Sequence, residues 1–455
     1  MDKLISVGLD VGTTTTQLVL SELMVENRGN AFSVPQMVIG NRNILYQSPV
    51  IFTPLISGEL VDGQAIANWV DAQYHVAGIP KNQVDTGAVI ITGETSRKEN
   101  AKEVLNHLAG FAGDFVVATA GPDLESVLSA KGAGATEYSS QTGKTVLHMD
   151  IGGGTSNLSF IENGKIVRTG CLNVGGRLVK FDDGGKVTYL SPVLNGITDL
   201  HLGDVPTESQ LKTITDQLVK ALQMAAGLLP PTDLLEKLTT KENAGLWHPE
   251  KPEVISFSGG VADCIEKDAP TFAYGDMGVL LGRAIKQSSL CQNYRLGEQT
   301  IRATVIGAGC HSTQLSGSTV FYADVELPKK NLPVAVLSQP ITEESVRGAY
   351  AGQDAENVVL AIPGNLSLNY QQIKDLAKIL LDGSRGELLV CLQADMAKAL
   401  GHCIRLAEPS RPCLCIDGLY LENESFLDIG SPVGPALPVV IKTLVLSTEG
   451  KSGTG

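Results

Sequence analysis

Residues 8–20 read GLDVGTTTTQLVL, and residues 148–161 read HMDIGGGTSNLSFI. In both stretches an apolar run ends near an aspartate, a short segment rich in glycine and hydroxyl side chains follows, and a second β-forming run begins. Two such runs around a polar, glycine-containing turn predict a β-hairpin. Because the same order of residue types occurs twice, the sequence predicts two related structural units.

Each predicted hairpin carries groups that can hold a terminal phosphate. Asp10 and Asp150 stand at strand ends, where a carboxylate can hold Mg²⁺, mostly through water. Glycine allows backbone N–H groups to approach phosphate oxygens closely. Either hairpin alone would suit an ordinary turn, but together they predict a clamp for one triphosphate. The residues expected to contact the phosphates are Gly12, Thr13, Thr14, Gly152, Gly153, Gly154 and Thr155.

A third segment, VISFSGGVAD at residues 254–263, places Gly259 and Gly260 directly after an apolar run. Paired glycines at this position are expected where the backbone lies flat against an adenine or a ribose. An ordinary strand-to-helix turn has the same pattern, so this alternative stays open. The position of the segment, after the second hairpin, suits a cleft closed from the second lobe.

Composition limits the class of protein. The chain has 455 residues, 43% of them hydrophobic and 18% charged, which predicts several compact domains. A net charge of −14 argues against nucleic-acid binding, which depends on phosphate attraction. The apolar stretches at residues 1–9 and 435–446 are too short for a membrane span, so we expect a cytoplasmic protein.

The eight cysteines are scattered, which suits a reducing compartment. Cys171 and Cys264 have no supporting motif for a bridging iron–sulfur cluster, and an iron-free protein is expected.

Beyond about residue 323, apolar runs alternate with helical patterns, which predicts an α/β unit with parallel strands. The expected division is a first lobe at 1–144, a second lobe at 145–322 and a C-terminal α/β domain at 323–455.

The two hairpins resemble the phosphate motifs of the actin, Hsp70 and sugar-kinase superfamily, and VISFSGGVAD is similar to its adenosine motif. Residues 121–135 and 275–285 resemble its two interdomain connecting helices. The resemblance implies an α/β, actin-like or Hsp70-like ATPase fold, in which two ribonuclease H-like lobes surround a nucleotide cleft and a C-terminal α/β domain is appended. It also implies ATP and Mg²⁺ as cofactors, with Asp10 and Asp150 as metal ligands.

Within the superfamily the chain resembles the reactivating factors of ethanolamine ammonia-lyase. The similarity extends through TGETSRKENAKEVL (92–105), IGAGCHSTQLSGST (306–319) and SPVGPALPVVIKTLVL (431–446). It implies an ATP-dependent chaperone that releases damaged cobalamin from the lyase so that intact adenosylcobalamin binds. The expected partners are the lyase and ATP or ADP. Association with an ethanolamine-utilising microcompartment and homo-oligomerisation are left open.

Two departures from Hsp70 affect the expected chemistry. Hsp70 proteins place a glutamate before the proline of the first connecting helix, whereas this chain has Gly121 before Pro122. Glu94 is our candidate for positioning the attacking water, and a surface or helix-initiating acid is an equal alternative. Residues 182–185 predict a hairpin turn where Hsp70 relatives begin a long helix, so peptide binding of the Hsp70 kind is not implied.

Two other functions fit the same fold, because fold alone does not determine function. A small-molecule kinase would need a general base, for which Asp182, Asp183 and Asp199 are candidates that the sequence does not separate. An actin-type filament or scaffold protein is the second rival. The chaperone differs from a kinase in hydrolysing ATP without a small acceptor.

Overall fold

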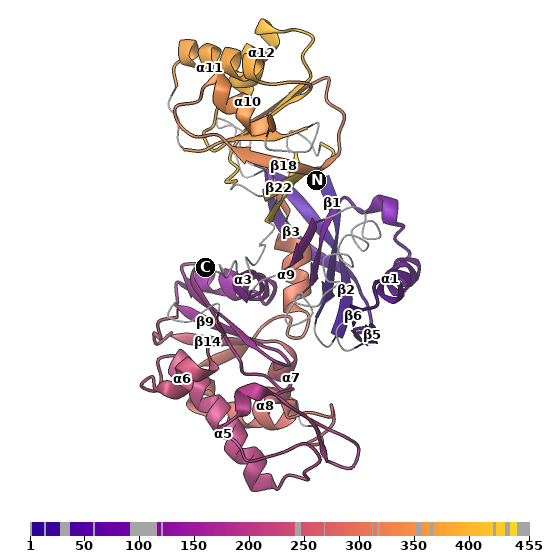
Figure 1. Cartoon of the computed structure of the whole chain (residues 1–455), viewed down its shortest axis with the longest axis vertical. Coiled ribbons are helices and arrows are strands. Elements are labelled where there is room, and N and C mark those ends of the chain that lie inside the picture. The colour runs from indigo at the N-terminus through magenta and orange to yellow at the C-terminus, as the bar shows by residue number, and fades with distance from the viewer. Residues whose placement is uncertain are drawn as a thin grey trace, which may run out of the picture.

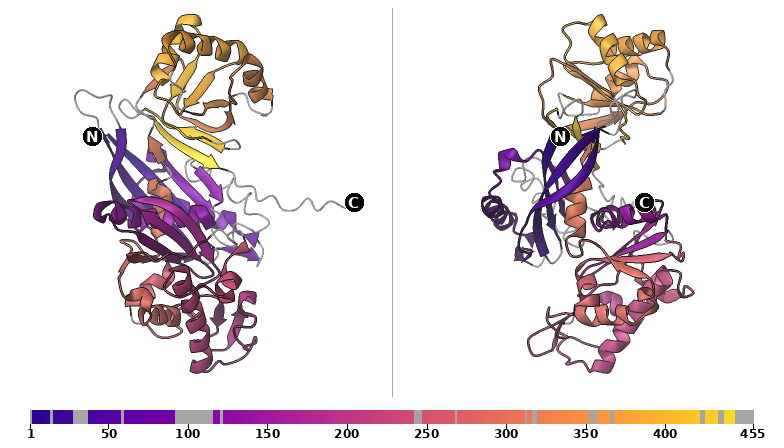
Figure 2. Two further views of the ribbon diagram at one scale, coloured as in Figure 1. Left: turned by 90° about the vertical axis from the view of Figure 1, so that its left-hand side faces the viewer. Right: turned by 180° about the vertical axis from the view of Figure 1, so that it is seen from behind.

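The computed structural model describes residues 2–12, 15–27, 37–57, 60–91, 116–119, 122–241, 247–267, 269–311, 313–315, 319–351, 357–364, 368–421, 425–432 and 437–443. These residues form three α/β units in a row (Figure 1), and the unit built from the N-terminal strands lies in the middle. The two views of Figure 2 show the same arrangement from the side and from behind.

The first lobe is a six-stranded sheet with the order β3-β2-β1-β7-β8, to which β4 adds by pairing with β2. β1, β2 and β3 are antiparallel neighbours, whereas β7 and β8 continue the sheet in parallel. Helix α1 begins at the cap Asp62, whose side chain accepts from the N–H of Ala65, and ends at the left-handed Gly78. The elements are β1 (Asp2–Val11), β2 (Thr15–Asn27), β3 (Met37–Gln47), β4 (Ile51–Phe52), β5 (Leu55–Ser57), β6 (Leu60–Val61), α1 (Gly63–Ala77), η1 (Lys81–Gln83), β7 (Thr86–Ile91) and β8 (Val116–Thr119).

The second lobe repeats this topology in the strand order β11-β10-β9-β14-β15. Again the first three strands along the chain are antiparallel neighbours and the last two are parallel additions. The repeat of strand order and direction confirms the expected fold of two ribonuclease H-like lobes. The elements are α4 (Ala135–Thr142), β9 (Val146–Ile151), β10 (Ser156–Glu162), β11 (Lys165–Leu172), β12 (Val179–Phe181), β13 (Val187–Leu190), η3 (Pro192–Leu194), α5 (Glu208–Ala225), α6 (Asp233–Leu238), β14 (Val254–Ser258), α7 (Gly260–Glu266), α8 (Gly278–Lys286), η5 (Ser289–Cys291) and β15 (Tyr294–Leu296).

Two helices cross between the lobes, α3 (Pro122–Gly132) and α9 (Ala303–His311). α3 packs on the second sheet and α9 on the first, and the two helices pack against each other. A methyl group at Gly132 would overlap the carbonyl oxygen of Ala303, and one at Gly307 would overlap that of Leu128. The glycines are therefore required by the close approach of the two backbones.

This arrangement corrects one interpretation of the sequence. The segment 275–285 was expected to supply the second connecting helix, but α8 packs against α7 and α5 inside the second lobe. Its Gly282 lies against the backbone of Cys264 in α7, so its small residues serve packing within that lobe. The connecting role belongs to α9, which follows α8 along the chain and has glycines of its own.

The third unit contains an eight-stranded sheet of order β16-β23-β22-β18-β19-β20-β21-β17. Strands β18 to β21 are parallel neighbours, as the alternating pattern predicted. β17 pairs with β21, so the sheet includes residues before 323. The elements are β16 (Thr313–Leu315), β17 (Val320–Ala323), β18 (Lys329–Val336), α10 (Glu343–Ala351), β19 (Val359–Ile362), α11 (Tyr370–Gly383), β20 (Leu388–Leu392), α12 (Ala397–Ala407), β21 (Cys413–Ile416), β22 (Ser425–Ile429) and β23 (Pro438–Thr443).

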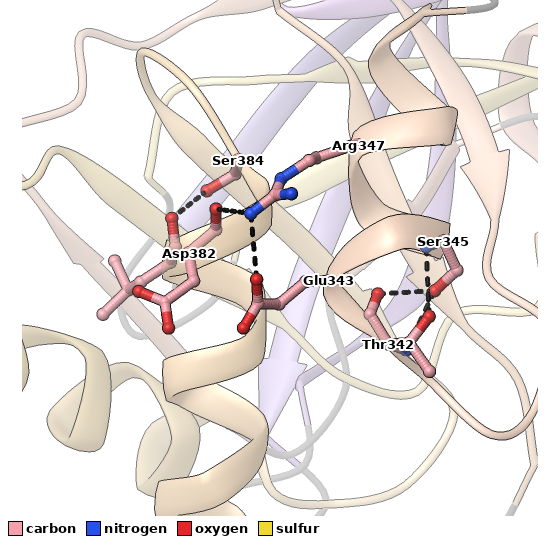
Figure 3. A network of polar contacts seen from close by, with 7 residues as sticks. Thr342, Glu343, Ser345, Arg347, Asp382 and Ser384 are labelled. Carbon is pink, nitrogen blue, oxygen red and sulfur yellow. Dashed lines mark hydrogen bonds and ion pairs between the residues drawn. The ribbon is translucent and has the colours of Figure 1, made fainter.

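Polar contacts fix the helices of the third unit (Figure 3). Thr342 and Ser345 cap the start of α10, because each side-chain hydroxyl accepts from the backbone N–H of the other residue. One Arg347 nitrogen donates to Glu343 at 2.9 Å and to the carbonyl oxygen of Asp382 at 3.4 Å, which joins α10 to the end of α11. The unit meets the first lobe through Val440, which belongs to an apolar cluster with Ala88 and Ile90.

Candidate nucleotide site

Both predicted hairpins are present, and their turns are closed by the same hydrogen bond. The N–H of Gly12 donates to the carbonyl oxygen of Thr15 at 2.9 Å, and the N–H of Gly152 donates to that of Thr155, also at 2.9 Å. Asp10 and Asp150 each lie two residues before these glycines, near the ends of β1 and β9. Thr13 and Thr14 lie outside the described residues.

Each aspartate is paired across the hairpin with a buried amide side chain. Asp10 lies opposite Gln17, and Asp150 lies opposite Asn157. Directly paired residues share one face of a sheet, so each amide lies on the same side as its aspartate. Sequence reasoning missed these amides, although both stand at the same spacing from the aspartate of their hairpin.

The two amides form hydrogen bonds to the two crossing helices, one near the start of α9 and one in α3. Gln17 Nε2 donates to the carbonyl oxygen of Ile301 at 3.0 Å, just before α9. Asn157 Nδ2 donates to Glu125 Oε2 of α3 at 2.9 Å. The remaining oxygens, Gln17 Oε1 and Asn157 Oδ1, are buried without a hydrogen-bond partner within the described part of the chain. Buried polar atoms usually have a hydrogen-bond partner, so these two oxygens indicate a site that water, a cation or a ligand donor would complete.

Asp150 is held from two sides. Ser258, its partner in the parallel ladder with β14, donates to Oδ1, and Thr304 of α9 donates to Oδ2 at 3.5 Å. The residue is only 9% exposed. Burial raises the pKa of the Asp150 carboxyl to about 6, and the two hydroxyl hydrogen bonds oppose this rise.

A buried histidine lies behind Ser258. His148 Nε2 is 2.9 Å from Ser258 Oγ, and Nδ1 is 3.2 Å from Ser256 Oγ. Because Ser258 donates its proton to Asp150, its oxygen accepts from Nε2–H, and Nδ1 accepts from Ser256. Burial lowers the pKa of His148 to about 3, which keeps the ring neutral in this chain of bonds.

The two hairpins approach the same turn at the start of α9. Thr304 contacts Asp150, while Ile301, three residues earlier, accepts from Gln17, the cross-strand partner of Asp10. Residues 301–304 therefore lie beside Asp150 and beside the strand partner of Asp10. Both hairpins thus reach the start of α9, although they belong to separate lobes.

A second contact joins the hairpins across the lobes. The Arg177 guanidinium lies 5.6 Å from the centre of the Phe52 ring. Phe52 pairs with Thr15 of the first hairpin, and Arg177 donates its backbone N–H to the carbonyl oxygen of Gly153 of the second at 2.6 Å. Arg177 also forms a 3.0 Å ion pair with Asp276. The GGR run at 175–177 is the only local signal that could have identified this arginine.

Glycine is required at two places around the second hairpin. A methyl group at Gly175 would overlap the carbonyl oxygen of Gly153, and one at Gly259 would overlap that of Ile151. Gly259 also has a φ of +86°, which other residues rarely adopt. By contrast, methyl groups at Gly154 and Gly260 would meet nothing within 4 Å. The predicted adenosine motif therefore lies against the strand end that carries Asp150. Space remains beside the backbone at Gly154 and at Gly260.

The donors present suit Mg²⁺. No group of three or more His, Cys, Asp and Glu side chains in the described residues forms a ready-made metal site. Mg²⁺ does not need one, because it usually keeps several waters and binds one or two carboxylates together with substrate phosphates. Two carboxylates and two orphaned amide oxygens beside a pair of phosphate-type turns fit that pattern.

Other candidate residues are placed less directly. Glu94 lies outside the described residues. Asp182, a candidate base for a kinase, accepts from the backbone N–H groups of Gly184 and Lys186 at 2.9 Å each, within the turn predicted there. Every helix in the described ranges is too short or too polar to cross a membrane.

The chain is similar to known proteins along most of its length. It is 38% identical over 466 aligned positions to the Escherichia coli (strain K12) protein named "Ethanolamine ammonia-lyase reactivase EutA", covering 97% of this chain and 98% of that protein. The Salmonella typhimurium protein of the same name is 37% identical, with the same coverage. Among solved structures, the Aquifex aeolicus member of the Ppx/GppA family aligns with 67% of this chain and 97% of its own, at 14% identity and a TM-score of 0.43. The family model described as "Ethanolamine utilisation protein EutA" matches residues 2–447, and the chain belongs to this family.

Proposed function

We propose that this protein is an ATP-dependent reactivating chaperone of the adenosylcobalamin-dependent ethanolamine ammonia-lyase. It would release damaged cobalamin so that intact adenosylcobalamin binds. Family membership and the shared name of its relatives support the target. The observation that supports ATP hydrolysis is the repeated hairpin, whose turn is closed in both lobes by the same hydrogen bond from a glycine N–H to a threonine carbonyl oxygen. A cytoplasmic location follows from this role.

ATP and Mg²⁺ are the cofactors of this proposal. Bound Mg²⁺ would neutralise charge on the phosphates, and Asp10 and Asp150 would hold it. The hairpin turns would surround the phosphates with backbone N–H groups and hydroxyls, and Gly259 and Gly260 would lie along the adenosine. The assigned phosphate contacts remain those of Gly12, Thr13, Thr14, Gly152, Gly153, Gly154 and Thr155.

The protein's own residues would prepare this site before nucleotide enters. Ser258 and Thr304 fix the Asp150 carboxylate, and His148 fixes Ser258. Arg177 places a guanidinium beside the second hairpin, where Asp276 holds it in an ion pair. Preorganised charge of this kind is the main means by which proteins accelerate phosphoryl transfer. Glu94 stays our candidate for orienting the attacking water, so Glu94→Gln should bind ATP but hydrolyse it slowly.

The crossing of α3 and α9 offers a route from nucleotide to partner. Each helix packs on a different sheet, so a change in the angle between the lobes must move one helix over the other. We propose the expected division into two ATPase lobes and a C-terminal partner-binding domain. In this division α3 and α4 belong with the second sheet, α9 belongs with the first sheet, and β16 and β17 belong with the C-terminal sheet.

A reactivation assay tests the proposal. Purified protein is mixed with lyase that has been inactivated with bound damaged cobalamin, and adenosylcobalamin and Mg-ATP are added. We expect lyase activity to return with ATP and to stay absent when a non-hydrolysable analogue replaces it. Absence of recovery with ATP, using a protein that binds ATP, would contradict the chaperone role and would leave the nucleotide site intact.

A further inference from the structure

A cavity of about 570 Å³ lies between the lobes, away from the two hairpins. Its wall from the first lobe is Arg42 of β3, and its other walls come from α3, α4 and β11. Lys165 lines it and lies opposite Glu162 in the β10–β11 strand register, at the end of β10. The second hairpin joins the opposite end of β10, at Ser156. The cavity is therefore separate from the proposed nucleotide site, and its volume suits a small ligand.

Positive charge dominates the lining in a protein whose net charge is −14. Among the described residues, four cationic side chains line the cavity against a single carboxylate, Glu137. They are Arg42, Lys131, Lys165 and Arg168. Arg168 is neutralised outside the cavity by an ion pair with Glu250, and Arg42 Nη1 lies 3.6 Å from Glu137. Lys131 and Lys165 form no ion pair with any described residue.

The cations are not fully satisfied by the protein. Burial lowers the pKa of Lys131, the nearby Arg42 lowers it further, and Glu137 acts in the opposite direction. Arg42 Nε is buried and has no hydrogen-bond partner among the described residues. An unpaired buried donor and a half-buried ammonium are costly unless an anion compensates them.

We propose that this cavity binds a small oxyanion of the phosphate type, held by Arg42, Lys131 and Lys165. A tetrahedral anion carries several oxygens, so it can accept from donors that approach from different sides. A single carboxylate serves less well, because Glu137 already sits beside Arg42 and leaves Nε unpaired. Arg42 belongs to the first lobe and the two lysines to the second, so the bound anion bridges the lobes.

The test uses the full chain, saturated with Mg-ADP so that the hairpins are occupied. Inorganic phosphate, pyrophosphate and phenyl phosphate are titrated by calorimetry. We expect at least one to bind, and Lys131→Gln and Arg42→Gln each to weaken that binding about tenfold or more, the loss typical of a charge-assisted bond. Preference for phenyl phosphate would identify a phosphate monoester as the ligand, and preference for an inorganic anion would identify the free ion.

Lys212→Gln is the matched control, because this exposed lysine of α5 pairs with Asp216 far along the same lobe. It should bind like the wild type. Lys131→Arg should retain most of the affinity. In the absence of anion, Lys131→Gln should melt no lower than the wild type, because it removes an uncompensated charge. Added phosphate should raise the melting temperature of the wild type more than that of Lys131→Gln.

Three outcomes would overturn the proposal. One is no binding of any of the three anions at tens of millimolar. Another is binding that Mg-ADP abolishes and the two cavity variants leave unchanged, which would place the anion in the hairpins. The third is a hexaglutamate peptide that binds more tightly than phosphate with the same dependence on Lys131, which would assign the cavity to a protein carboxylate.

Discussion

The two hairpins share a frame and differ in what supports it. In the first, Thr53 Oγ1 donates to the carbonyl oxygen of Gly12 at 2.7 Å, so a side chain backs the turn. In the second, backbone backs the turn, because the N–H groups of Gly176 and Arg177 donate to the carbonyls of Gly152 and Gly153. The cross-strand amides also differ, since Gln17 bonds a backbone carbonyl whereas Asn157 bonds the Glu125 carboxylate.

A repeated fold therefore fixes the positions of the two aspartates and leaves their chemistry to the side chains around them. Equal strand order places Asp10 and Asp150 at equivalent strand ends. In the second lobe a ladder serine, a buried histidine and a helix threonine surround the carboxylate. We therefore expect both aspartates to be needed, although the side chains around them differ.

The largest effect is expected from removal of either carboxylate. Asp10→Ala and Asp150→Ala should each reduce ATP turnover by about 100-fold or more, because metal and phosphate charge lose a fixed ligand. Reactivation of the lyase should fall with it. Turnover is measured by phosphate release, and circular dichroism confirms that each variant is folded.

Asp216→Ala is the control for this pair, because Asp216 is a half-buried acid of α5 that pairs with Lys212. It should turn over ATP at the wild-type rate. Wild-type turnover in a folded Asp10→Ala variant alone would show that the first hairpin is a structural copy without a metal ligand, and it would break the proposed equivalence.

Asp150→Asn should stabilise the metal-free protein at pH 7.5. Burial raises the folded-state pKa from 3.8 to about 6, so the folded protein holds the ionised carboxylate at a cost when the pH exceeds about 6. This cost is at most about 3 kcal/mol and is relieved as the pH falls from about 6 to about 4. The asparagine keeps an acceptor for Ser258 and carries no charge.

Thermal unfolding with a metal chelator present measures this effect at several pH values. The melting temperature of Asp150→Asn should exceed that of the wild type at pH 7.5, and the gap should close towards pH 4. A variant that melts below the wild type at pH 7.5 would mean that the ionised carboxylate stabilises its surroundings, which is opposite to the expected sign.

Gly175→Ala probes the backbone support of the second hairpin. The added methyl group would overlap the carbonyl oxygen of Gly153, which cannot move without disturbing the turn. We expect a loss of about 1–3 kcal/mol in unfolding free energy, typical of overpacking, and weaker ADP binding. Denaturant unfolding and calorimetry measure the two effects.

Gly348→Ala in α10 is the matched control, because a methyl group there meets nothing within 4 Å. It should be neutral or stabilise by up to about 1 kcal/mol through helix propensity. Equal unfolding free energies and equal ADP affinities of the two variants would mean that the segment 175–177 shifts to make room for the methyl group. The second hairpin would then not depend on this segment.

The hairpins and the lobe topology could be predicted because their signals are local. A strand, an aspartate and a glycine turn lie within a few residues of one another, and the repeat at 148–161 reinforces the pattern at 8–20. The choice between α8 and α9 could not be made this way. Both helices carry well-spaced small residues that face another backbone, and only the crossing with α3 shows which helix joins the lobes.

Contacts between segments far apart in the chain could not be predicted from the sequence either. β17 joins the C-terminal sheet by pairing with β21, a partner far along the chain, so the expected boundary at 323 fell inside the sheet's edge strand. Ser258 was seen only as part of a strand before two glycines, and its bond to Asp150 depends on the parallel register of β14 with β9. Register of this kind leaves no mark in a single sequence.

The smallest expected effect concerns the contact that joins the hairpins across the lobes. Phe52 is 74% exposed, and its ring faces the Arg177 guanidinium. A cation–π contact at an exposed site contributes about 0.5–1 kcal/mol, so Phe52→Leu should weaken ADP binding by about two- to fivefold and barely change the melting temperature. A double-mutant cycle with Arg177→Lys isolates the coupling, because both single variants disturb the ring contact while charge near Asp276 is kept. Tyr189→Leu is the matched control: the Tyr189 ring lies 5.4 Å from Lys180 inside the second lobe, so its loss should leave ADP affinity unchanged. Additive effects of Phe52→Leu and Arg177→Lys would mean that the contact does not hold the lobes in the nucleotide-binding arrangement.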